Sequence, residues 1–254
     1  MQWDFERDTA FVTGGGSGIG QAVALKLAAQ GVKVAVADLD GAKAEATVSQ
    51  IRASGQTALP VVVDVSKSNE VGRAVAEAEA EFGTLSYLVN VAGISHQAPL
   101  QDITDEQWSR MLAVHLNGSF FCIRAVLPKM LENGFGAIAS LSSMHGLKGQ
   151  EYAAHYSAAK AGIAAMTKAV AREVAGKGVR INALAPGPID TPMWRRGLTG
   201  EALDKRRTER AKQVPMGRLG QPEEVADLAL FLLSSASSYF TGQVVGVNGG
   251  ELMP

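Results

Sequence analysis

The chain has 254 residues, of which 46% are hydrophobic and 19% are charged, and its formal net charge is −1. This length suits one domain with a single large core, and the small net charge argues against nucleic acid or an anionic membrane as a partner. The single cysteine, Cys122, excludes an intramolecular disulfide framework and a cysteine-based zinc site, and we expect no metal centre. The first residues are charged and no run of 18 apolar residues occurs, so we predict a cytoplasmic protein without a membrane span.

Apolar runs of strand length alternate with longer helical patterns along most of the chain. Strands are predicted at residues 9–13, 33–38, 57–63, 87–91, 136–141, 180–185 and 243–247. Helices are predicted at 18–30, 41–54, 68–82, 105–131, 153–176 and 222–233. Alternation of this kind is typical of right-handed βαβ units in a parallel sheet that is covered on both faces. We therefore predict one α/β domain over residues 1–254, with a Rossmann-type doubly wound sheet of about seven strands.

A glycine-rich turn, Thr13-Gly14-Gly15-Gly16-Ser17-Gly18-Ile19-Gly20, follows the first predicted strand and leads into a helix. Glycines permit positive φ and let backbone N–H groups approach a diphosphate, which then lies at the positive end of the helix. A flexible turn has the same composition, but the strand before it and the helix after it favour a dinucleotide site. The candidate cofactor contacts in this turn are Gly14, Ser17, Gly18, Ile19 and Gly20.

Asp38 ends the second predicted strand and is followed by Leu39. A carboxylate at this place can accept hydrogen bonds from the adenosine ribose, and it repels a 2′-phosphate. Neither Ser17 nor Leu39 supplies a cation for such a phosphate. We place Asp38 and Leu39 at the cofactor site and predict NAD in preference to NADP; the alternative is an aspartate that only caps a turn.

The next two strand ends carry further candidates. Asp64, followed by Val65, ends the third strand, where its carboxylate could meet the adenine amino group or cap the helix that begins at 66–68. The fourth strand ends in Asn90-Val91-Ala92-Gly93. We expect this segment to be partly structural and partly cofactor-facing, with contacts from Asn90, Ala92 and Gly93.

Tyr156 and Lys160 are separated by one helical turn in an alanine-rich segment. Positions i and i+4 share a helix face, so the phenol and the ammonium point the same way. A phenol has a pKa of about 10 in water, and a cation within about 4–6 Å favours the phenolate. The pair is therefore a candidate acid–base centre, although a tyrosine and a lysine on a solvated helix face would look the same.

The regular alternation is interrupted at residues 187–215, which contain several prolines and a mixed, basic helix predicted at 201–212. A long insertion after a strand is where loops that cover a ligand occur. We call residues 187–215 the substrate loop.

Together these motifs resemble the classical short-chain dehydrogenase/reductase family, and the resemblance covers essentially the whole chain. The family motifs match Thr13–Gly20, Asn90–Gly93, Tyr156 with Lys160, and Pro186-Gly187. One departure is Val91, where the family has a second asparagine. The family serine lies 13 residues before the tyrosine, which gives Ser143, with Ser140 and Ser142 as alternatives. The family asparagine in the long fourth helix is matched by Asn117.

The resemblance implies a catalytic set of Asn117, Ser143, Tyr156 and Lys160. Tyr156 would exchange a proton with the substrate oxygen, and Ser143 would hydrogen-bond that oxygen. Lys160 would lower the pKa of Tyr156 and, like the tyrosine, contact the cofactor, while Asn117 would anchor a water. Further cofactor contacts are implied at Pro186, Gly187, Ile189 and Thr191; for Thr191 a helix cap is the alternative.

The predicted function is an NAD(H)-dependent oxidoreductase that interconverts a secondary alcohol and a ketone. The alternative is an NADPH-dependent 3-oxoacyl-thioester (acyl carrier protein) reductase, and a more distant one is a non-enzymatic dinucleotide-binding regulator. Candidate substrate contacts are Ser143, His145, Gln150, Tyr156, Met193 and Trp194; Ser95, His96, Gln97 and Leu147 are further lining candidates. Arg195 and Arg196 could pair with an acidic group or stay solvated.

Relatives of this kind are usually tetramers, so the resemblance implies a homotetramer, with a dimer as the alternative. The two long helices that carry Asn117 and Tyr156 would form the contact through outward apolar groups, for which the candidates are Phe121, Val126, Ile163 and Met166.

Overall fold

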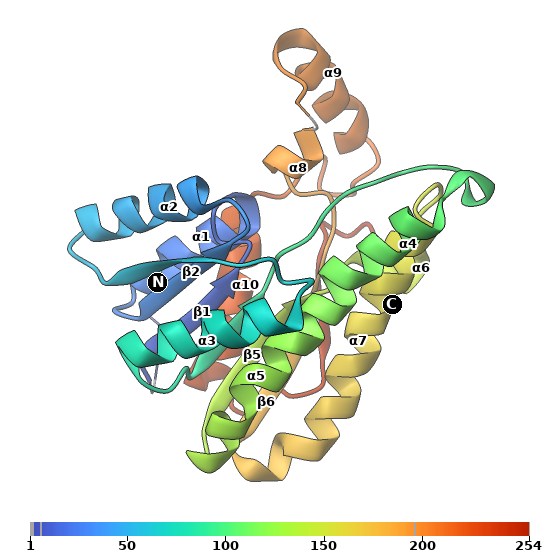
Figure 1. Ribbon diagram of the computed structural model, residues 1–254. Coiled ribbons are helices and arrows are strands. Elements are labelled where there is room, and N and C mark those ends of the chain that lie inside the picture. The colour runs from blue at the N-terminus through green and yellow to red at the C-terminus, as the bar shows by residue number, and fades with distance from the viewer. Residues whose placement is uncertain (1–2, 6, 196, 254) are drawn as a thin grey trace.

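The computed structural model describes residues 3–5, 7–195 and 197–253. Seven parallel strands form one sheet in the order β3-β2-β1-β4-β5-β6-β7 (Figure 1). Their bounds differ from the predicted ones by at most one residue at either end: β1 (Thr9–Thr13), β2 (Lys33–Asp38), β3 (Ala58–Val62), β4 (Tyr87–Asn90), β5 (Gly136–Leu141), β6 (Val179–Pro186) and β7 (Val244–Val247). The strand order reverses between β1 and β4, which is the place where such sheets bind ligands. The predicted single Rossmann-type sheet is confirmed.

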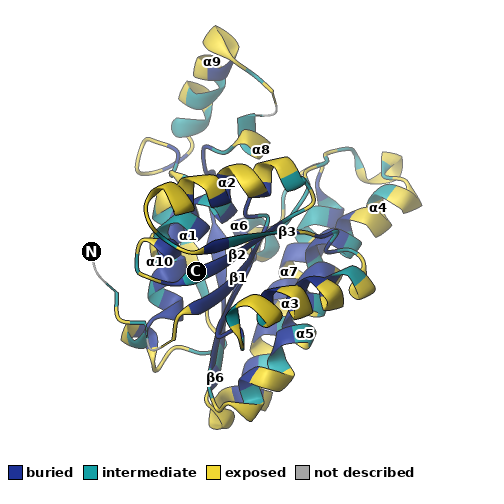
Figure 2. Ribbon diagram, turned by 60° about the vertical axis from the view of Figure 1, so that its left-hand side comes forward, coloured by how far each residue is buried: buried dark blue, intermediate teal, exposed yellow. Residues whose placement is uncertain are grey.

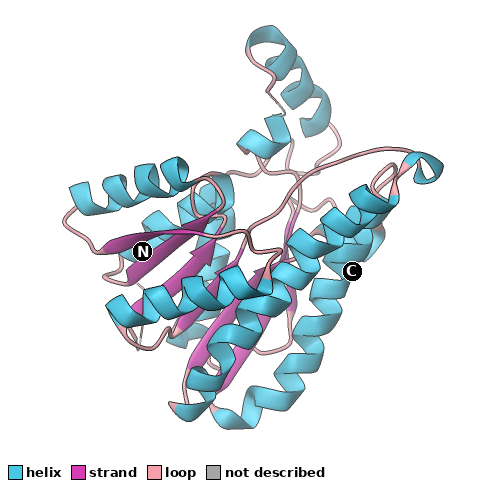
Figure 3. Ribbon diagram, viewed as in Figure 1, coloured by secondary structure: helices cyan, strands magenta, loops and turns pink. Residues whose placement is uncertain are grey.

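Helices cover both faces of the sheet (Figure 3). One face carries α1 (Gly18–Ala28), α2 (Gly41–Ala53) and α10 (Pro222–Leu233), and the other carries α3 (Ser68–Phe82), α5 (Gly118–Glu132) and α7 (Ala154–Val174). Successive strand side chains point to opposite faces, so Val12 packs with the first group of helices and Phe11 with the second. Short 3₁₀ turns occur at Leu100–Asp102, Ala175–Lys177 and Ser235–Ser237.

The helix predicted at 105–131 is divided in the structure. It comprises α4 (Asp105–Leu112), a π-helical segment η2 (Ala113–Asn117) and α5. Among the described residues, the run Asp105–Glu132 is the one helix that is long and apolar enough to cross a membrane by length and composition alone. Ile123 and Val126 of this run are buried against the sheet, as expected for a core helix.

Two of the four proposed outward groups lie inside the protein instead. Val126 and Ile163 are each 1% exposed, because the faces of α5 and α7 that carry them pack inward. The prediction that they form a subunit contact is therefore wrong, whereas Phe121 and Met166 are partly buried at the edge of the core. Cys122 is a buried free thiol, and burial raises its pKa to about 12.

The substrate loop stands above the carboxyl ends of the strands (Figure 1). It contains α8 (Pro192–Arg195) and α9 (Gly200–Ala211), and of the residues of α9 only Leu203 is buried (Figure 2). The loop is attached at its base because Asp190 accepts hydrogen bonds from the Nε atoms of Arg195 at 2.7 Å and Arg207 at 3.0 Å. A short helix that the sequence pattern did not predict, α6 (Met144–Lys148), follows β5 and packs against α7.

Candidate active site

The glycine turn between β1 and α1 approaches its neighbours too closely for side chains. A Cβ on Gly20 would lie 2.1 Å from the carbonyl oxygen of Gly14, and a Cβ on Gly14 would lie 2.9 Å from the backbone of Ala92. Gly14 and Gly18 also have positive φ, at 65° and 55°. The turn therefore exposes backbone at the start of α1, which is the arrangement that a diphosphate requires.

A cavity of about 240 Å³ extends from this turn along the carboxyl ends of the strands. Of the predicted cofactor contacts, it is lined by Gly14, Ser17, Gly18, Ile19, Asp38, Leu39, Asp64, Val65, Ala92, Gly93, Tyr156, Lys160 and Thr191. Pro186, Gly187 and Ile189 line a second, adjoining cavity. The chain's groove and glycine turn thus fit a dinucleotide.

The remaining predicted contacts, Asn90 and Gly20, are not among the described residues that line either cavity. The Nδ2 atom of Asn90 donates to Ser140 Oγ at 3.1 Å, while its Oδ1 atom is buried without a hydrogen-bond partner among the described residues. Thr13 holds the same segment, because its Oγ1 accepts the backbone N–H groups of Val91 at 3.1 Å and Ala92 at 3.2 Å. The departure at Val91 therefore leaves the backbone of this motif in place.

Asp38 caps the turn and also lines the cofactor cavity, so the two roles considered for it are compatible. One carboxylate oxygen accepts the N–H of Gly16 at 2.9 Å and the other accepts the N–H of Asp40 at 3.0 Å. A carboxylate offers about four lone-pair positions, so acceptor capacity remains for ribose hydroxyls. Lys43, which the sequence analysis did not consider, is close to the same turn: a Cβ on Gly16 would lie 2.6 Å from its Cβ, and its Nζ pairs with Asp40 at 3.1 Å.

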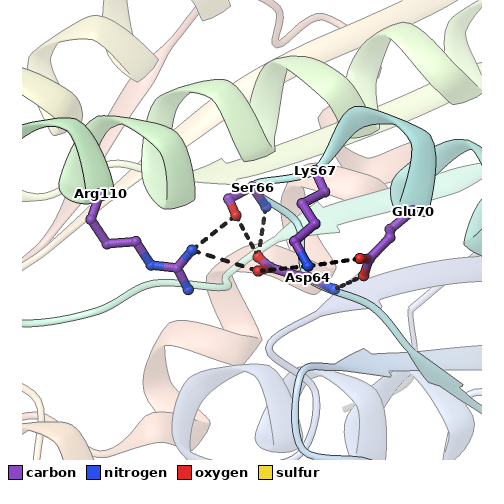
Figure 4. Close-up of polar contacts among 5 residues, drawn as sticks. All are labelled: Asp64, Ser66, Lys67, Glu70 and Arg110. Carbon is purple, nitrogen blue, oxygen red and sulfur yellow. Dashed lines mark hydrogen bonds and ion pairs between the residues drawn. The ribbon is translucent and has the colours of Figure 1, made fainter. Parts of the chain in front are cut away.

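Asp64 is held in a polar cluster at the end of the third strand (Figure 4). Its Oδ1 accepts the backbone N–H of Ser66 at 3.0 Å and the Ser66 hydroxyl at 2.6 Å. Its Oδ2 lies 3.5 Å from Arg110 and 3.9 Å from Lys67. Burial opposes the charge on Asp64, but these hydrogen bonds and cations outweigh it and lower its pKa. Asp64 therefore caps the turn, and Arg110 adds a cation to the cavity wall that the sequence did not indicate.

Ser143, Tyr156 and Lys160 are brought together by α6 and α7. Ser143 begins α6, where its Oγ accepts the N–H of His145 at 3.1 Å, and its hydroxyl also hydrogen-bonds the Tyr156 phenol. The two alternative serines are engaged elsewhere: Ser140 accepts from Asn90, and the Ser142 hydroxyl donates to the backbone carbonyl of Lys160 at 2.8 Å. The residue at the family spacing is thus the serine that contacts the tyrosine.

Lys160 is buried, and its Nζ donates to the carbonyl of Leu141 at 2.5 Å and lies 5.7 Å from the centre of the Tyr156 ring. Burial lowers the pKa of Lys160 to about 7, so its charge is only partly present at neutral pH. Burial also raises the pKa of Tyr156, and the hydrogen bond from Ser143 opposes that rise only in part. The expectation that Lys160 lowers the phenol pKa is therefore not met in this geometry, because burial raises that pKa and the Ser143 hydrogen bond is the group that opposes the rise.

Asn117 does not lie with these three residues. Its side chain is exposed at the end of η2, and it is absent from the residues that line either cavity among those described. His115, two residues earlier, is 2% exposed, and its ring meets that of Tyr156 edge-on with 5.3 Å between centroids. Helical spacing from the buried Met111 would have indicated that His115 points inward, since position 115 lies one turn further along the same face.

A second cavity, of about 440 Å³, adjoins the first at Tyr156. It is lined by all six predicted substrate contacts, namely Ser143, His145, Gln150, Tyr156, Met193 and Trp194, and by Ser95, His96 and Gln97. Thr191 lines both cavities and also caps α8 through its Oγ1, which accepts the N–H of Trp194 at 3.1 Å. Leu147 is exposed and does not line the cavity; Arg195 pairs with Asp190, and Arg196 is outside the described residues.

Side chains of α9 complete this second cavity: Arg206, Glu209, Arg210 and Gln213 just beyond its end. Arg206 stacks on the Trp194 ring at 4.8 Å, and Arg210 pairs with Glu251 of the carboxyl-terminal segment at 2.5 Å. Glu251 also pairs with Lys148 of α6 at 2.8 Å. Burial, followed by the charge of Lys148, lowers the pKa of His145 to about 4, so this residue is neutral near pH 7. Within the described residues no group of three His, Cys, Asp or Glu side chains is arranged to hold a metal ion.

Comparison with known proteins identifies the family of this chain. The family model described as Enoyl-(Acyl carrier protein) reductase matches residues 14–251. A 3-oxoacyl-(acyl-carrier-protein) reductase of Chlamydia trachomatis is 40% identical over 243 residues, which cover 95% of this chain and 96% of the relative. The reductases of the same name from Thermotoga maritima and Staphylococcus aureus are 37% and 38% identical, over 96% of this chain and 98% of each relative. The chain belongs to the classical short-chain dehydrogenase/reductase family, and it is an NAD(P)-binding oxidoreductase.

Proposed function

We propose that the chain reduces 3-oxoacyl thioesters to 3-hydroxyacyl thioesters. The observation that carries this proposal is the length of the match: relatives that bear this name align over 95–96% of the chain, so the alignment spans the substrate loop as well as the Tyr156 region. This substrate was the alternative in the sequence analysis. It takes the place of the unspecified secondary alcohol or ketone as the first candidate.

The residues around the two cavities supply the proton chemistry of such a reduction. Tyr156 donates its proton to the ketone oxygen, and Ser143 hydrogen-bonds that oxygen as charge develops on it. The raised pKa of Tyr156 keeps the phenol protonated, as a proton donor must be. Lys160, whose pKa is lowered to about 7, stands beside it to exchange a proton near neutral pH. When bound, the nicotinamide cofactor supplies the hydride.

The second cavity suits a substrate with an apolar part and a polar carrier. Leu141, Ile189 and Met193 line its inner region together with the tyrosine, whereas Arg206 and Arg210 enter it from α9. An acyl chain pairs with the first group, and the amide and phosphate groups of a thioester carrier pair with the second.

For the cofactor, we expect NADH to be used in preference to NADPH because the Asp38 carboxylate lines the cofactor cavity. A 2′-phosphate would meet this negative charge. NADPH is the alternative, and Lys43 and Arg110 are the cations that would favour it. We further expect a cytoplasmic protein that forms a homotetramer. Light scattering of the purified protein will test the tetramer.

A second candidate function is the NAD(H)-dependent oxidation of a small polar alcohol. It is favoured by the polar side chains that line the second cavity, among them His96, Gln150 and Glu209. A small polyol would hydrogen-bond these groups, whereas an acyl chain would leave them without partners.

The experiment is a rate measurement at the absorbance of the reduced cofactor, with acetoacetyl-coenzyme A and its matched control, ethyl acetoacetate, which has the same ketone without the thioester carrier. We expect kcat/KM at least tenfold higher for the thioester, with NADH above NADPH. Equal rates with the two ketones, or turnover only of alcohols, would contradict the proposal. Tight cofactor binding without turnover of any substrate would favour the regulator.

A further inference from the structure

His115 occupies a place beside the reacting phenol that the sequence analysis gave to another residue. Its ring lies edge-on to Tyr156, lines the cofactor cavity and carries a buried Nδ1 with no partner among the described residues. Gly93 faces the ring so closely that a Cβ there would lie 2.4 Å from His115 Cε1. The glycine after β4 is therefore what leaves room for the imidazole.

The ring is attached to the loop after β4 through one nitrogen. His115 Nε2 lies 2.9 Å from the carbonyl oxygen of Ile94 and 3.1 Å from the backbone nitrogen of the same residue. In a neutral imidazole this nitrogen either donates or accepts, so it satisfies only one of the two backbone groups at a time. Burial, and next the charge of Lys160, lowers the pKa of His115 to about 3, so the neutral ring is the form that this contact uses.

The burial pattern of the π-helical turn shows that Asn117 does not take this place. Residues 113–117 form one wide turn between α4 and α5, and within it Val114 and His115 are buried while Asn117 is exposed. Such turns often mark functional sites because they redirect side chains. The hydroxyl of Ser119 donates to the carbonyl of His115 at 2.7 Å, which fixes the backbone on the inward side.

We propose that His115, and not Asn117, is the positioning residue of this site: it holds the Gly93–Ile94 backbone against the Tyr156 side of the cavity. An asparagine would make the same attachment more completely, since one amide both donates to a carbonyl and accepts from an N–H. His115 thus stands in this chain where the family asparagine is expected to act. The role depends on the hydrogen bond between His115 Nε2 and the backbone of Ile94, and not on a charge.

The test compares four variants of the full-length protein: His115→Asn, His115→Leu, His115→Ala and, as the matched control from the same turn, Asn117→Ala. His115→Leu and His115→Ala should lower kcat by about 10- to 100-fold with the cofactor KM changed by less than about threefold, because displaced reacting groups affect rate more than binding. His115→Asn should restore kcat to within about threefold of the native value. Asn117→Ala should stay within about twofold.

One further measurement, of thermal stability, makes the result decisive. Thermal unfolding without cofactor should show a lower midpoint for His115→Ala and recovery for His115→Asn, since a partly buried backbone group without a partner destabilises the folded state. Native kcat in His115→Leu despite a lower midpoint would mean a purely structural role and overturn the proposal, as would a loss in Asn117→Ala equal to that in His115→Ala. The inference rests on the proposed reductase activity only for the kcat measurements. An inactive native protein would refute that function, and the midpoints would still decide the attachment.

Discussion

Replacement of Tyr156 by phenylalanine removes one hydroxyl from the centre of the site. The ring keeps its packing against His115 and its place at the junction of the two cavities. The hydroxyl's hydrogen bond to Ser143 is lost, but Ser143 Oγ still accepts the N–H of His145. The cofactor cavity is otherwise unchanged, so we expect its affinity for the cofactor to be preserved.

The expected effects on rate and on stability differ in size. Loss of general acid catalysis lowers kcat by about 10²–10⁴-fold, which corresponds to about 2.7–5.4 kcal/mol in the activation free energy. Loss of one hydrogen bond between neutral hydroxyls lowers the free energy of unfolding by only about 0.5–1.5 kcal/mol. A large fall in rate with a small fall in stability is therefore the signature of a proton donor.

Tyr152→Phe is the matched control, because Tyr152 lies in the turn just before α7, is 54% exposed and is absent from the described lining of both cavities. The assay follows thioester reduction by absorbance, with cofactor affinity measured by fluorescence and stability by urea unfolding. We expect full activity in Tyr152→Phe and almost none in Tyr156→Phe. Activity in Tyr156→Phe above about a tenth of the native value would refute the assignment of the proton donor.

Three further predictions concern the cofactor cavity and its surroundings. Asp38→Asn should raise the ratio of kcat/KM for NADPH to that for NADH by about tenfold or more, because a 2′-phosphate no longer meets a negative charge; an unchanged ratio would exclude Asp38 as its determinant. Gly20→Ala should weaken cofactor binding by more than about tenfold, since its Cβ would lie 2.1 Å from the carbonyl of Gly14, whereas Gly72→Ala, with open space around it, should bind normally in the same titration. Burial holds the pKa of Lys160 at about 7 in the folded protein, whereas a lysine in the unfolded chain has a pKa of about 10.4. The unfolded chain therefore binds more protons between these values, so the free energy of unfolding relative to that of Lys160→Met should rise from pH 7 to pH 9. Parallel pH profiles of the two proteins in urea unfolding would contradict this.

The sheet could be predicted closely because its signals are local. Each strand is a short apolar run with a turn or a helix signal after it, and a strand buried on both faces tolerates little else. The run at 105–131 shows the limit of such signals. Its apolar pattern correctly indicates helix, but it does not indicate the division into α4, the π turn at 113–117 and α5, because no residue type in this segment announces a π turn.

The predictions for the candidate site also divide into those that local signals supported and those that depended on the folded structure. Tyr156 and Lys160 follow from one helical spacing, and Ser143 follows from the spacing that the family resemblance implies; the structure brings the three together as expected. The choice of Asn117 depended on residue type alone, whereas the helical spacing from the buried Met111 puts His115 inside and leaves Asn117 exposed. The state of Lys160 could not be foreseen either, since its lowered pKa depends on complete burial under α6, which the sequence pattern did not predict.

The wall of the substrate cavity was the least predictable part. Arg206 and Arg210 reach it from α9, which is polar on almost every side and gives no periodic signal of an inward face. Arg110 and Lys43 are similar cases, because each extends from a helix and not from a strand end: Arg110 lines the cofactor cavity, and Lys43 lies beside the glycine turn at Gly16. Long charged side chains gain their roles from the fold around them, and composition alone does not distinguish them from solvated ones.

Glu251 has a practical consequence for anyone who modifies this protein. Its two carboxylate oxygens pair separately with Lys148 of α6 and Arg210 of α9, so it links these two helices through the carboxyl-terminal segment. A tag attached near Glu251 should disturb this link and the wall of the second cavity, although Glu251 is more than ninety residues from Tyr156 in the sequence. If α9 is replaced by the corresponding helix of a relative, residue 251 should be replaced with it, because Glu251 is the acidic partner of Arg210 in α9.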